Sequence, residues 1–288
     1  MGRRVPLLLL GLVACGSTAP AAGTEPPTIR VRVVGSGPPM VLVPGLACSD
    51  AVWRSLEPRL QRDHELHLVT LPGFAGQPPA AGPVIARARR ELAAYLRERR
   101  LERPILVGHS LGATVVLGLA GDEPRRTGAV IALDGAPFGA ALADPEATPE
   151  RVRPRADALR ARVAAISPDQ LASQAALMFR PMVTDPRDME WILPMVLASD
   201  VATVADAMHE LMTTDLRGHT RNITSPVLLL VADEHLDGPD DLAVYRAQLQ
   251  AQGPVRVEAI ERSRHFVMLD QPALVEAAIR RFLAAAAP

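Results

Sequence analysis

The stretch PILVGHSLG, residues 104–112, is the most informative part of this chain of 288 residues. An apolar run leads into a Gly-x-Ser-x-Gly pentapeptide, and residues 113–120 have the composition of a helix. This order predicts a strand, a sharp turn and a helix, with Ser110 at the apex of the turn. Gly108 and Gly112 flank the serine at a distance of two residues, where the lack of a side chain lets strand and helix approach each other. We therefore expect the Ser110 hydroxyl to stand clear of the backbone.

Outward from this turn, apolar strand-like runs alternate with helix-like stretches. The expected strands are residues 28–34, 40–43, 64–71, 104–107, 128–133, 226–231 and 255–260. The expected helices are residues 51–61, 84–100, 113–120, 240–250 and 272–283. Apolar strands that alternate with helices predict an α/β fold, in which a mostly parallel central sheet carries helices on both faces.

Residues 137–222 interrupt this alternation, because they contain helix-like stretches and no convincing strand. Six of the nine methionines fall here, namely Met178, Met182, Met189, Met195, Met208 and Met212. Such an insertion predicts a helical cap, residues 137–222, over a core formed by residues 28–136 and 223–288. The cap would cover the strand ends and the serine. We expect about half of these flexible side chains to line a pocket and the others to pack between helices.

A serine hydroxyl becomes a nucleophile only when a base removes its proton, and that base needs an acid to orient it. Among the seven histidines, His265 has the position expected of the base. It lies between the last predicted strand and the last predicted helix, beyond the C-terminal ends of the strands. Ligands bind outside those strand ends in open α/β sheets.

Taken together, these features make the chain resemble the α/β-hydrolase superfamily over residues 28–285. The matching segments are VPGL at residues 43–46, LPGFAG at 71–76, the pentapeptide at 108–112 and RHF at 264–266. The resemblance implies an α/β-hydrolase fold and a catalytic order of serine, acid and histidine. It also implies that Ser110 and His265 act in the cleavage of carboxylic esters through an acyl-enzyme intermediate.

The oxyanion hole is a second implication of the resemblance. By the pattern of the superfamily, its donors are the backbone amides of Leu46 and Leu111. The usual His-Gly of this loop is Pro44-Gly45 here. Because the hole uses backbone N–H groups, the loss of that histidine leaves the donors in place.

Two positions compete for the acid that orients His265. Many members of the superfamily carry it in a Gly-x-x-Asp turn, which corresponds here to ADEH at residues 232–235, with His235 at the aspartate position and Asp233 two residues early. Other members, including haloalkane dehalogenases and certain lipases, carry it at the end of the preceding strand, where this chain has Asp134. We favour Asp134, with Asp233 as the alternative. We predict an Asp134 carboxylate oxygen within about 3 Å of a His265 ring nitrogen, with Asp233 pointing elsewhere.

The N-terminal segment has the features of a targeting signal. Two arginines precede an apolar run, residues 7–13, which is too short to span a bilayer. LVAC at residues 12–15 resembles the lipobox of bacterial lipoproteins, in which cleavage before the cysteine accompanies its lipidation. We therefore expect a signal peptide at residues 1–14, a lipid-modified Cys15 and a flexible tether over residues 15–27. This predicts a lipid-anchored protein of the bacterial cell envelope, and the alternative is a secreted protein.

Composition excludes several kinds of partner. The formal net charge is −1 and the chain has no long basic run, so no nucleic-acid partner is expected. No cluster of cysteine and histidine has the spacing of metal ligands, so we expect no metal and no cofactor. The expected partners are a small-molecule ester and, through the lipid anchor only, a membrane.

Two alternatives to an ester hydrolase follow from the same sequence. The first is other chemistry on the same fold, such as that of a perhydrolase or peroxidase-like enzyme or a C–C hydrolase, since fold does not fix function. A haloalkane dehalogenase is disfavoured because its nucleophile is an aspartate, whereas this chain has Ser110. The second is a catalytically inactive envelope binding protein. A covalent label on Ser110 would distinguish an enzyme from a binding protein.

Overall fold

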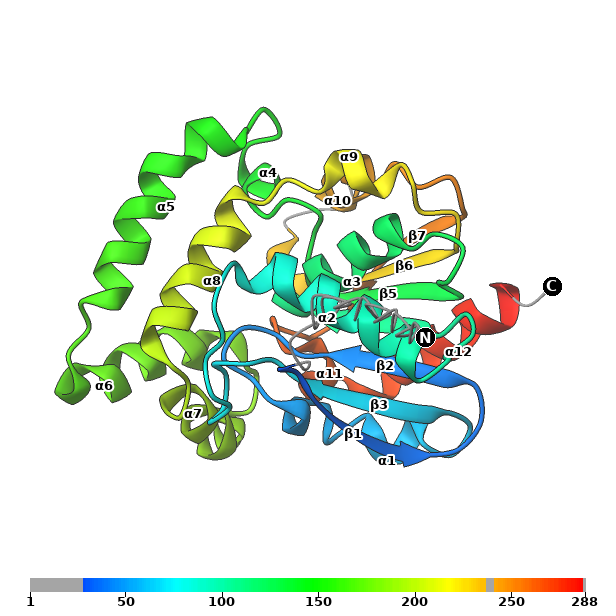
Figure 1. Cartoon of the computed structure of the whole chain (residues 1–288), viewed down its shortest axis with the longest axis horizontal. Coiled ribbons are helices and arrows are strands. Elements are labelled where there is room, and N and C mark those ends of the chain that lie inside the picture. Colours follow the sequence, from blue (N-terminus) through cyan, green and yellow to red (C-terminus); the bar gives the residue numbers. More distant parts are fainter. Residues whose placement is uncertain (1–27, 237–240, 287–288) are drawn as a thin grey trace, which may run out of the picture.

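A seven-stranded sheet forms the centre of the molecule, and the computed structural model describes residues 28–236 and 241–286 (Figure 1). The strands are β1 (Arg30–Gly35), β2 (Pro39–Val43), β3 (Glu65–Thr70), β4 (Ile105–His109), β5 (Ala129–Leu133), β6 (Val227–Ala232) and β7 (Val255–Ile260). Their order across the sheet is β1-β3-β2-β4-β5-β6-β7, and every neighbouring pair is parallel except β1 with β3. The predicted α/β class with a mostly parallel sheet is confirmed.

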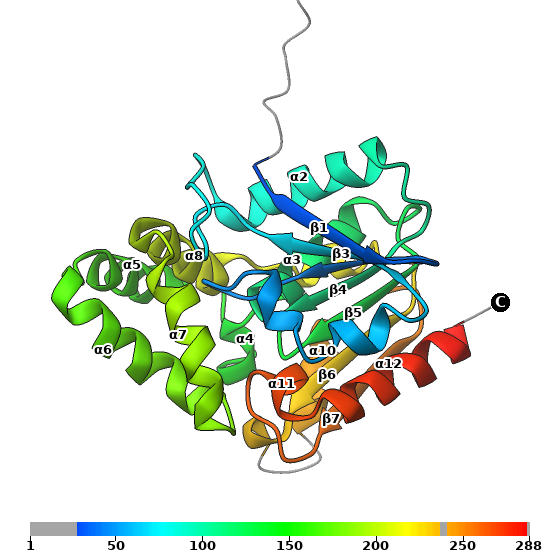
Figure 2. The same ribbon diagram turned by 90° about the horizontal axis from the view of Figure 1, so that it is seen from below.

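Both faces of the sheet are buried, because successive residues of each strand point to opposite sides. In β5, Val130 and Ala132 pack in one hydrophobic cluster, whereas Ile131 and Leu133 pack in the other. The helices on the first side are α2 (Val84–Glu98), α3 (Leu111–Asp122) and α10 (Asp241–Gln248). Those on the second side are α1 (Glu57–Leu60), α11 (Val267–Asp270) and α12 (Pro272–Ala286). Figure 2 shows α2 and α12 on opposite sides of the sheet.

A helical segment separates β5 from β6 and lies beside the sheet (Figure 1). Its helices are α4 (Ala140–Ala143), α5 (Pro149–Ala164), α6 (Pro168–Phe179), α7 (Met189–Leu197), α8 (Val201–Thr213) and α9 (Arg217–Thr220). Helix α5 packs along α8, and α6 packs on α7. Helices α5 and α8 are joined by an ion pair of Arg160 with Asp206 at 2.5 Å and by a hydrogen bond of His209 with Asp157 at 2.9 Å. We call this segment, residues 137–222, the cap.

The helix predicted at residues 51–61 is not continuous. A 3₁₀ turn, Asp50–Trp53, is followed by the short α1, which begins at Glu57. Pro58 explains the break, because its ring lacks an N–H and would clash with the carbonyl of residue 54 in a continuous helix. The prediction of a single helix there was wrong.

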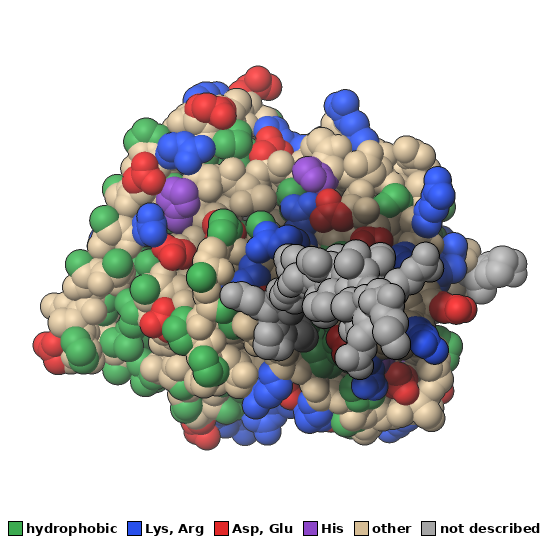
Figure 3. All heavy atoms as spheres, viewed as in Figure 1, with side chains coloured by type: hydrophobic (Ala, Val, Ile, Leu, Met, Phe, Trp, Pro, Cys, Tyr) green, Lys and Arg blue, Asp and Glu red, His purple; other side chains and the backbone are tan. Residues whose placement is uncertain are grey.

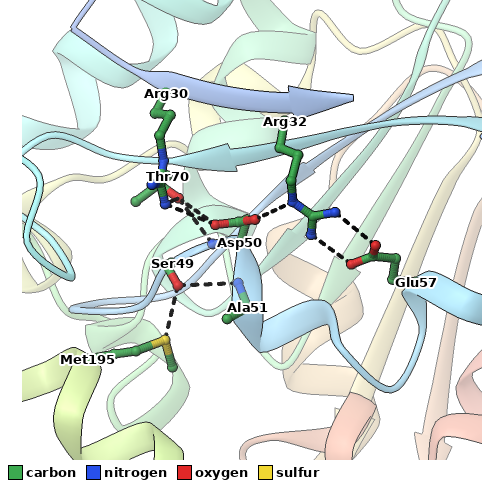
Figure 4. Close-up of polar contacts among 8 residues, drawn as sticks. All are labelled: Arg30, Arg32, Ser49, Asp50, Ala51, Glu57, Thr70 and Met195. Carbon is green, nitrogen blue, oxygen red and sulfur yellow. Dashed lines mark hydrogen bonds and ion pairs between the residues drawn. The ribbon is translucent and has the colours of Figure 1, made fainter. Parts of the chain in front are cut away.

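The loop after β2 is fastened to the edge of the sheet and to the cap (Figure 4). The Asp50 carboxylate accepts hydrogen bonds from Arg30 at 3.1 Å and from Arg32 at 2.8 Å, both on the edge strand β1. The Ser49 hydroxyl accepts the N–H of Ala51 and lies 3.0 Å from the sulfur of Met195 in α7. These contacts hold the end of the loop in place relative to both the core and the cap.

Residues 1–27 lie outside the described residues, and with them the predicted signal peptide, Cys15 and tether. Among the described helices, none alone is long and apolar enough to cross a membrane, whereas Pro186–Leu197 and Val201–Thr213 reach that length together, with a 105° bend between them. On the face shown in Figure 3, basic and acidic side chains are interspersed. This mixture agrees with the near-zero net charge of the chain.

Candidate active site

Ser110 occupies a strained turn between β4 and α3. Its backbone has φ of +53° and ψ of −117°, a conformation that non-glycine residues rarely adopt. A Cβ atom on Gly108 would lie 2.2 Å from the carbonyl oxygen of Gly112, and one on Gly112 would lie 2.1 Å from that of Val43. Both glycines are therefore required by close backbone approach, as the sequence predicted. The turn places the serine at the C-terminal end of β4.

Ser110 and His265 line the same cavity of about 240 Å³. The cap contributes Met178, Met182, Met208 and Met212 to its walls. Within the described residues, the Ser110 hydroxyl makes no hydrogen bond to another group. The nucleophile and the base proposed from the sequence thus face one small, largely apolar space.

Asp134 directly follows β5, and its carboxylate meets the loop that carries His265. One oxygen, Oδ2, lies 2.6 Å from His265 Nδ1, so the predicted distance is confirmed. The other oxygen accepts the backbone N–H of Ala232 at 2.8 Å. Since a carboxylate only accepts, His265 carries its proton on Nδ1 and leaves Nε2 free to receive one. The catalytic roles of these residues stay a prediction.

The Asp134 side chain is almost completely buried, with 3% of it exposed. Burial opposes the ionisation of this carboxyl group, but hydrogen bonds from His235 and His265 outweigh that effect and hold its pKa well below the usual range. The group is therefore a carboxylate at neutral pH, as an acceptor of two imidazole N–H groups must be.

Asp233, the alternative acid, lies in a 3₁₀ turn, Asp233–His235, after β6. Its carboxylate accepts the backbone N–H groups of Arg262 at 2.6 Å and of Ser263 at 2.9 Å. It makes no hydrogen bond with the His265 ring. Asp233 instead holds the backbone of the loop that leads to His265.

His109 has a contact that the sequence did not reveal. Its Nε2–H donates to the backbone carbonyl of His265 at 2.9 Å, and the centres of the two rings are 4.7 Å apart. Complete burial, together with the nearby His265, lowers the pKa of His109 to about 3, so the ring is neutral. His109, next to Ser110 in sequence, thus ties the loop of residues 261–266 to the serine turn. Because this loop carries His265, the proposed base, we call it the base loop.

His235 also contacts the acid. Its Nε2 lies 3.0 Å from Asp134 Oδ2, the oxygen that His265 also uses. This hydrogen bond raises the pKa of His235 in spite of burial, and the charges of Asp134 and Glu234 act in the same direction. The only sequence signal for this contact was the histidine at the position where many relatives carry their acid.

The amides of Leu46 and Leu111 are available as donors. Neither donates to an acceptor among the described residues. Leu111 is the first residue of α3, where N–H groups have no partner within the helix. Leu46 lines the cavity with Ser110, and a Cβ on the neighbouring Gly45 would lie 3.2 Å from that of Ser110. The predicted oxyanion loop therefore packs directly against the turn.

Asp134, His235 and His265 also form a group of possible metal ligands, since their ligand atoms all lie within 4.8 Å of one another. Two of these pairs are already joined by hydrogen bonds, which need the protons on His235 Nε2 and His265 Nδ1. A metal ion would displace both protons. We therefore assign no metal to this group.

The Alpha/beta hydrolase family matches residues 40–278. A pimeloyl-acyl-carrier-protein methyl ester esterase of Aeromonas hydrophila is 36% identical over 113 residues, covering 38% of this chain and 42% of that protein. An enzyme of the same name from Nitrosospira multiformis is 26% identical over 275 residues, covering 88% and 98% respectively. The chain spans about two fifths of the length of several such relatives.

Solved structures agree with the fold. A thermophilic esterase from Thermogutta terrifontis superposes with a TM-score of 0.73 at 21% identity, covering 90% of this chain and 93% of the other. At that level of identity, the likeness shows a shared fold.

Proposed function

The chain belongs to the alpha/beta hydrolase family, and from that premise we propose that it is a serine hydrolase that cleaves carboxylic esters through an acyl-enzyme intermediate. One observation carries the proposal. Ser110, on its strained turn, shares a cavity with His265, whose Nδ1 lies 2.6 Å from the buried Asp134 carboxylate. We infer that His265, oriented by this carboxylate, accepts the Ser110 proton when substrate is bound, which would turn the hydroxyl into a nucleophile.

In the proposed first half-reaction, the Ser110 oxygen attacks the ester carbonyl carbon while His265 Nε2 takes the hydroxyl proton. The carbonyl electron pair moves onto its oxygen, where the amides of Leu46 and Leu111 donate to the negative charge. When the C–O bond breaks, His265 gives its proton to the leaving alcohol. The acyl group remains on Ser110.

In the second half-reaction, water takes the place of the alcohol. His265 Nε2 removes a proton from the water as its oxygen attacks the acyl carbon. The bond to Ser110 then breaks, and His265 returns the proton to the serine oxygen. Asp134 stays ionised throughout and stabilises the imidazolium form of His265 in both halves.

The walls of the cavity favour an apolar group on the substrate. Methionine and phenylalanine side chains of the cap surround the serine, and methionine adapts its shape to different occupants. A larger cavity of about 620 Å³ lies within the cap and shares Leu159, Met178, Phe179 and Met208 with the smaller one. The two cavities together provide room for an extended apolar acyl chain. The curated relatives named above are ester hydrolases, which supports the same substrate class.

A panel of esters, lactones and amides, assayed with purified protein and with Ser110→Ala, tests the proposal. We expect the wild type to hydrolyse esters and the variant to lose several orders of magnitude in kcat, leaving on the order of 10³ over water. Turnover that persists in Ser110→Ala would contradict the mechanism. Formation of peroxyacids, or cleavage of C–C bonds, in preference to ester hydrolysis would favour other chemistry on this fold.

A further inference from the structure

Two histidines converge on one carboxylate oxygen in this site. Asp134 Oδ2 lies 2.6 Å from His265 Nδ1 and 3.0 Å from His235 Nε2. The proposed mechanism uses only the first of these contacts. We propose that His235 is a positioning residue for the proposed ester hydrolysis, and that its Nε2–H holds the Asp134 carboxylate against His265; this inference rests on the proposed function.

The hydrogen-bonding capacity of Asp134 allows this role. An ionised carboxylate has about four acceptor positions and no donor, so each contact must be donated by its partner. The N–H of Ala232 at 2.8 Å fixes Oδ1, and the two imidazoles fix Oδ2. Without His235, the orientation of the carboxylate would depend on Ala232 and on His265, the group that must itself be oriented.

The turn that carries His235 is tied to the loop of the base at consecutive residues. Asp233 accepts two backbone N–H groups of that loop. Glu234 accepts the backbone N–H of His265 at 3.2 Å and pairs with Arg264 at 3.4 Å. His235 completes the series by binding the acid. The turn and the loop therefore form one unit around Asp134, in which His235 has a fixed place.

Protonation of His235 gives the proposal a signature of its own. The groups that face His235 are Asp134 after β5, Glu234 from its own turn and His265 from the base loop. The ring centres of His235 and His265 are 6.4 Å apart. Arg264, also in the base loop, is paired with Glu234. A cationic His235 repels the positive charge that His265 acquires during the proposed reaction, across ring centres 6.4 Å apart. A side chain that donates an N–H but cannot become a cation removes this effect and keeps the hydrogen bond.

The test compares His235→Gln, which retains an N–H donor, with His235→Leu, which lacks one. His219→Leu is the matched control, because His219 lies 3.7 Å from Asp122, the last residue of α3, and does not line the cavity. With a p-nitrophenyl ester, we expect His235→Leu to lose about 10- to 100-fold in kcat with KM unchanged, the usual effect of one hydrogen bond to a charged group. We expect His235→Gln to stay within about threefold and to move the acid limb of the kcat/KM profile to higher pH by about 0.5 to 1 unit.

Three results would overturn the proposal: a kcat of His235→Leu within twofold of wild type, equal losses in both His235 variants, or a loss carried by KM. If circular dichroism shows that His235→Leu does not fold, the pH profile of His235→Gln decides alone, and an unmoved acid limb overturns the proposal.

If the wild type hydrolyses no ester and takes no fluorophosphonate label, the proposed function fails. The low-field proton resonance of His265 Nδ1–H then decides, with a shift in His235→Gln supporting the role and an unchanged resonance overturning it.

Discussion

At the scale of single residues, the position of Asp134 is fixed by its backbone conformation and by three hydrogen bonds to its carboxylate. Its backbone φ is +46°, a conformation that aspartate and asparagine adopt more readily than most residues. The short side chain then reaches Ala232, His235 and His265 at once. A longer glutamate at the same position would not place its carboxylate among these three donors.

Replacing Asp134 by asparagine is expected to lower kcat by as much as about 10⁴-fold, because an amide supports the wrong tautomer of His265. Asp233→Asn is the matched control. It removes one negative charge from the same region, and its amide oxygen still accepts from the base loop, so we expect less than a tenfold loss. Steady-state kinetics on one ester would check both, and a larger loss in Asp233→Asn would reverse the assignment.

His109 makes stability depend on pH. Its folded pKa is about 3, below the value of 6.5 for an unperturbed histidine, so the unfolded chain binds a proton that the folded protein refuses. This contribution of His109 to the free energy of unfolding is fully present above pH 6.5. It is lost as pH falls toward 3, by up to about 1.4 kcal/mol per pH unit. His109→Gln retains an N–H donor and cannot titrate. Urea unfolding between pH 7 and 4 should show the advantage of the wild type over this variant shrinking as pH falls, and parallel curves would contradict the account.

The turn between β4 and α3 is the element that positions Ser110, and its glycines are required because the backbone approaches closely at these positions. A Cβ on Gly112 would meet the backbone of Val43 and Pro44 at 2.1 and 2.6 Å, whereas the atoms nearest to one on Gly118 belong to the Arg89 side chain, at 2.8 Å. The same helix therefore contains one glycine that cannot be replaced and one that can.

Gly112→Ala is expected to destabilise the protein by more than about 2 kcal/mol and to abolish turnover, because overpacking displaces the turn. Gly118→Ala is expected to be neutral, or to gain up to about 1 kcal/mol from the better helix propensity of alanine. Denaturant unfolding of both variants measures the difference. Equal stability of the two variants would show that the close approach at Gly112 is not required.

The strands, most helices and the serine turn could be predicted because their signals are local: apolar runs, flanking glycines and prolines, and helical periodicity. The break near Pro58 was not predicted, although a proline disfavours a continuous helix through its own turn. The contact of His235 with Asp134 joins residues that are 101 positions apart in sequence. It exists because β5 and β6 are neighbours and end at the same edge of the sheet. Nothing in either segment alone indicates that meeting.

At the scale of the whole molecule, the cap supplies much of the wall of the cavity that Ser110 lines. The cavity of about 620 Å³ between its helices shares four lining residues with the cavity at Ser110, which we call the catalytic cavity from its proposed role. These residues are Leu159, Met178, Phe179 and Met208. The size of the larger cavity lies in the range of small-molecule pockets. Anchoring through Cys15 stays a prediction, because that residue lies outside the described residues.

Leu171→Trp should narrow the larger cavity, which Leu171 lines without touching the catalytic one. We expect kcat/KM for a dodecanoyl ester to fall at least about tenfold while that for an acetyl ester stays unchanged, since a blocked pocket rejects only the chain that fills it. Ala172→Trp, on the exposed side of the same helix, is the control and should change neither value. Equal effects on short and long esters would place the acyl chain elsewhere.

The central claim is that Ser110 is an activated nucleophile, and labelling with a fluorophosphonate probe followed by peptide mass spectrometry tests it without knowledge of the substrate. The account predicts one label per chain, on Ser110, and no label in Ser110→Ala. The probe reacts with the activated serine itself, so the test requires no choice of ester. A wild-type protein that stays unlabelled, or a Ser110→Ala variant that is labelled as before, would contradict the account.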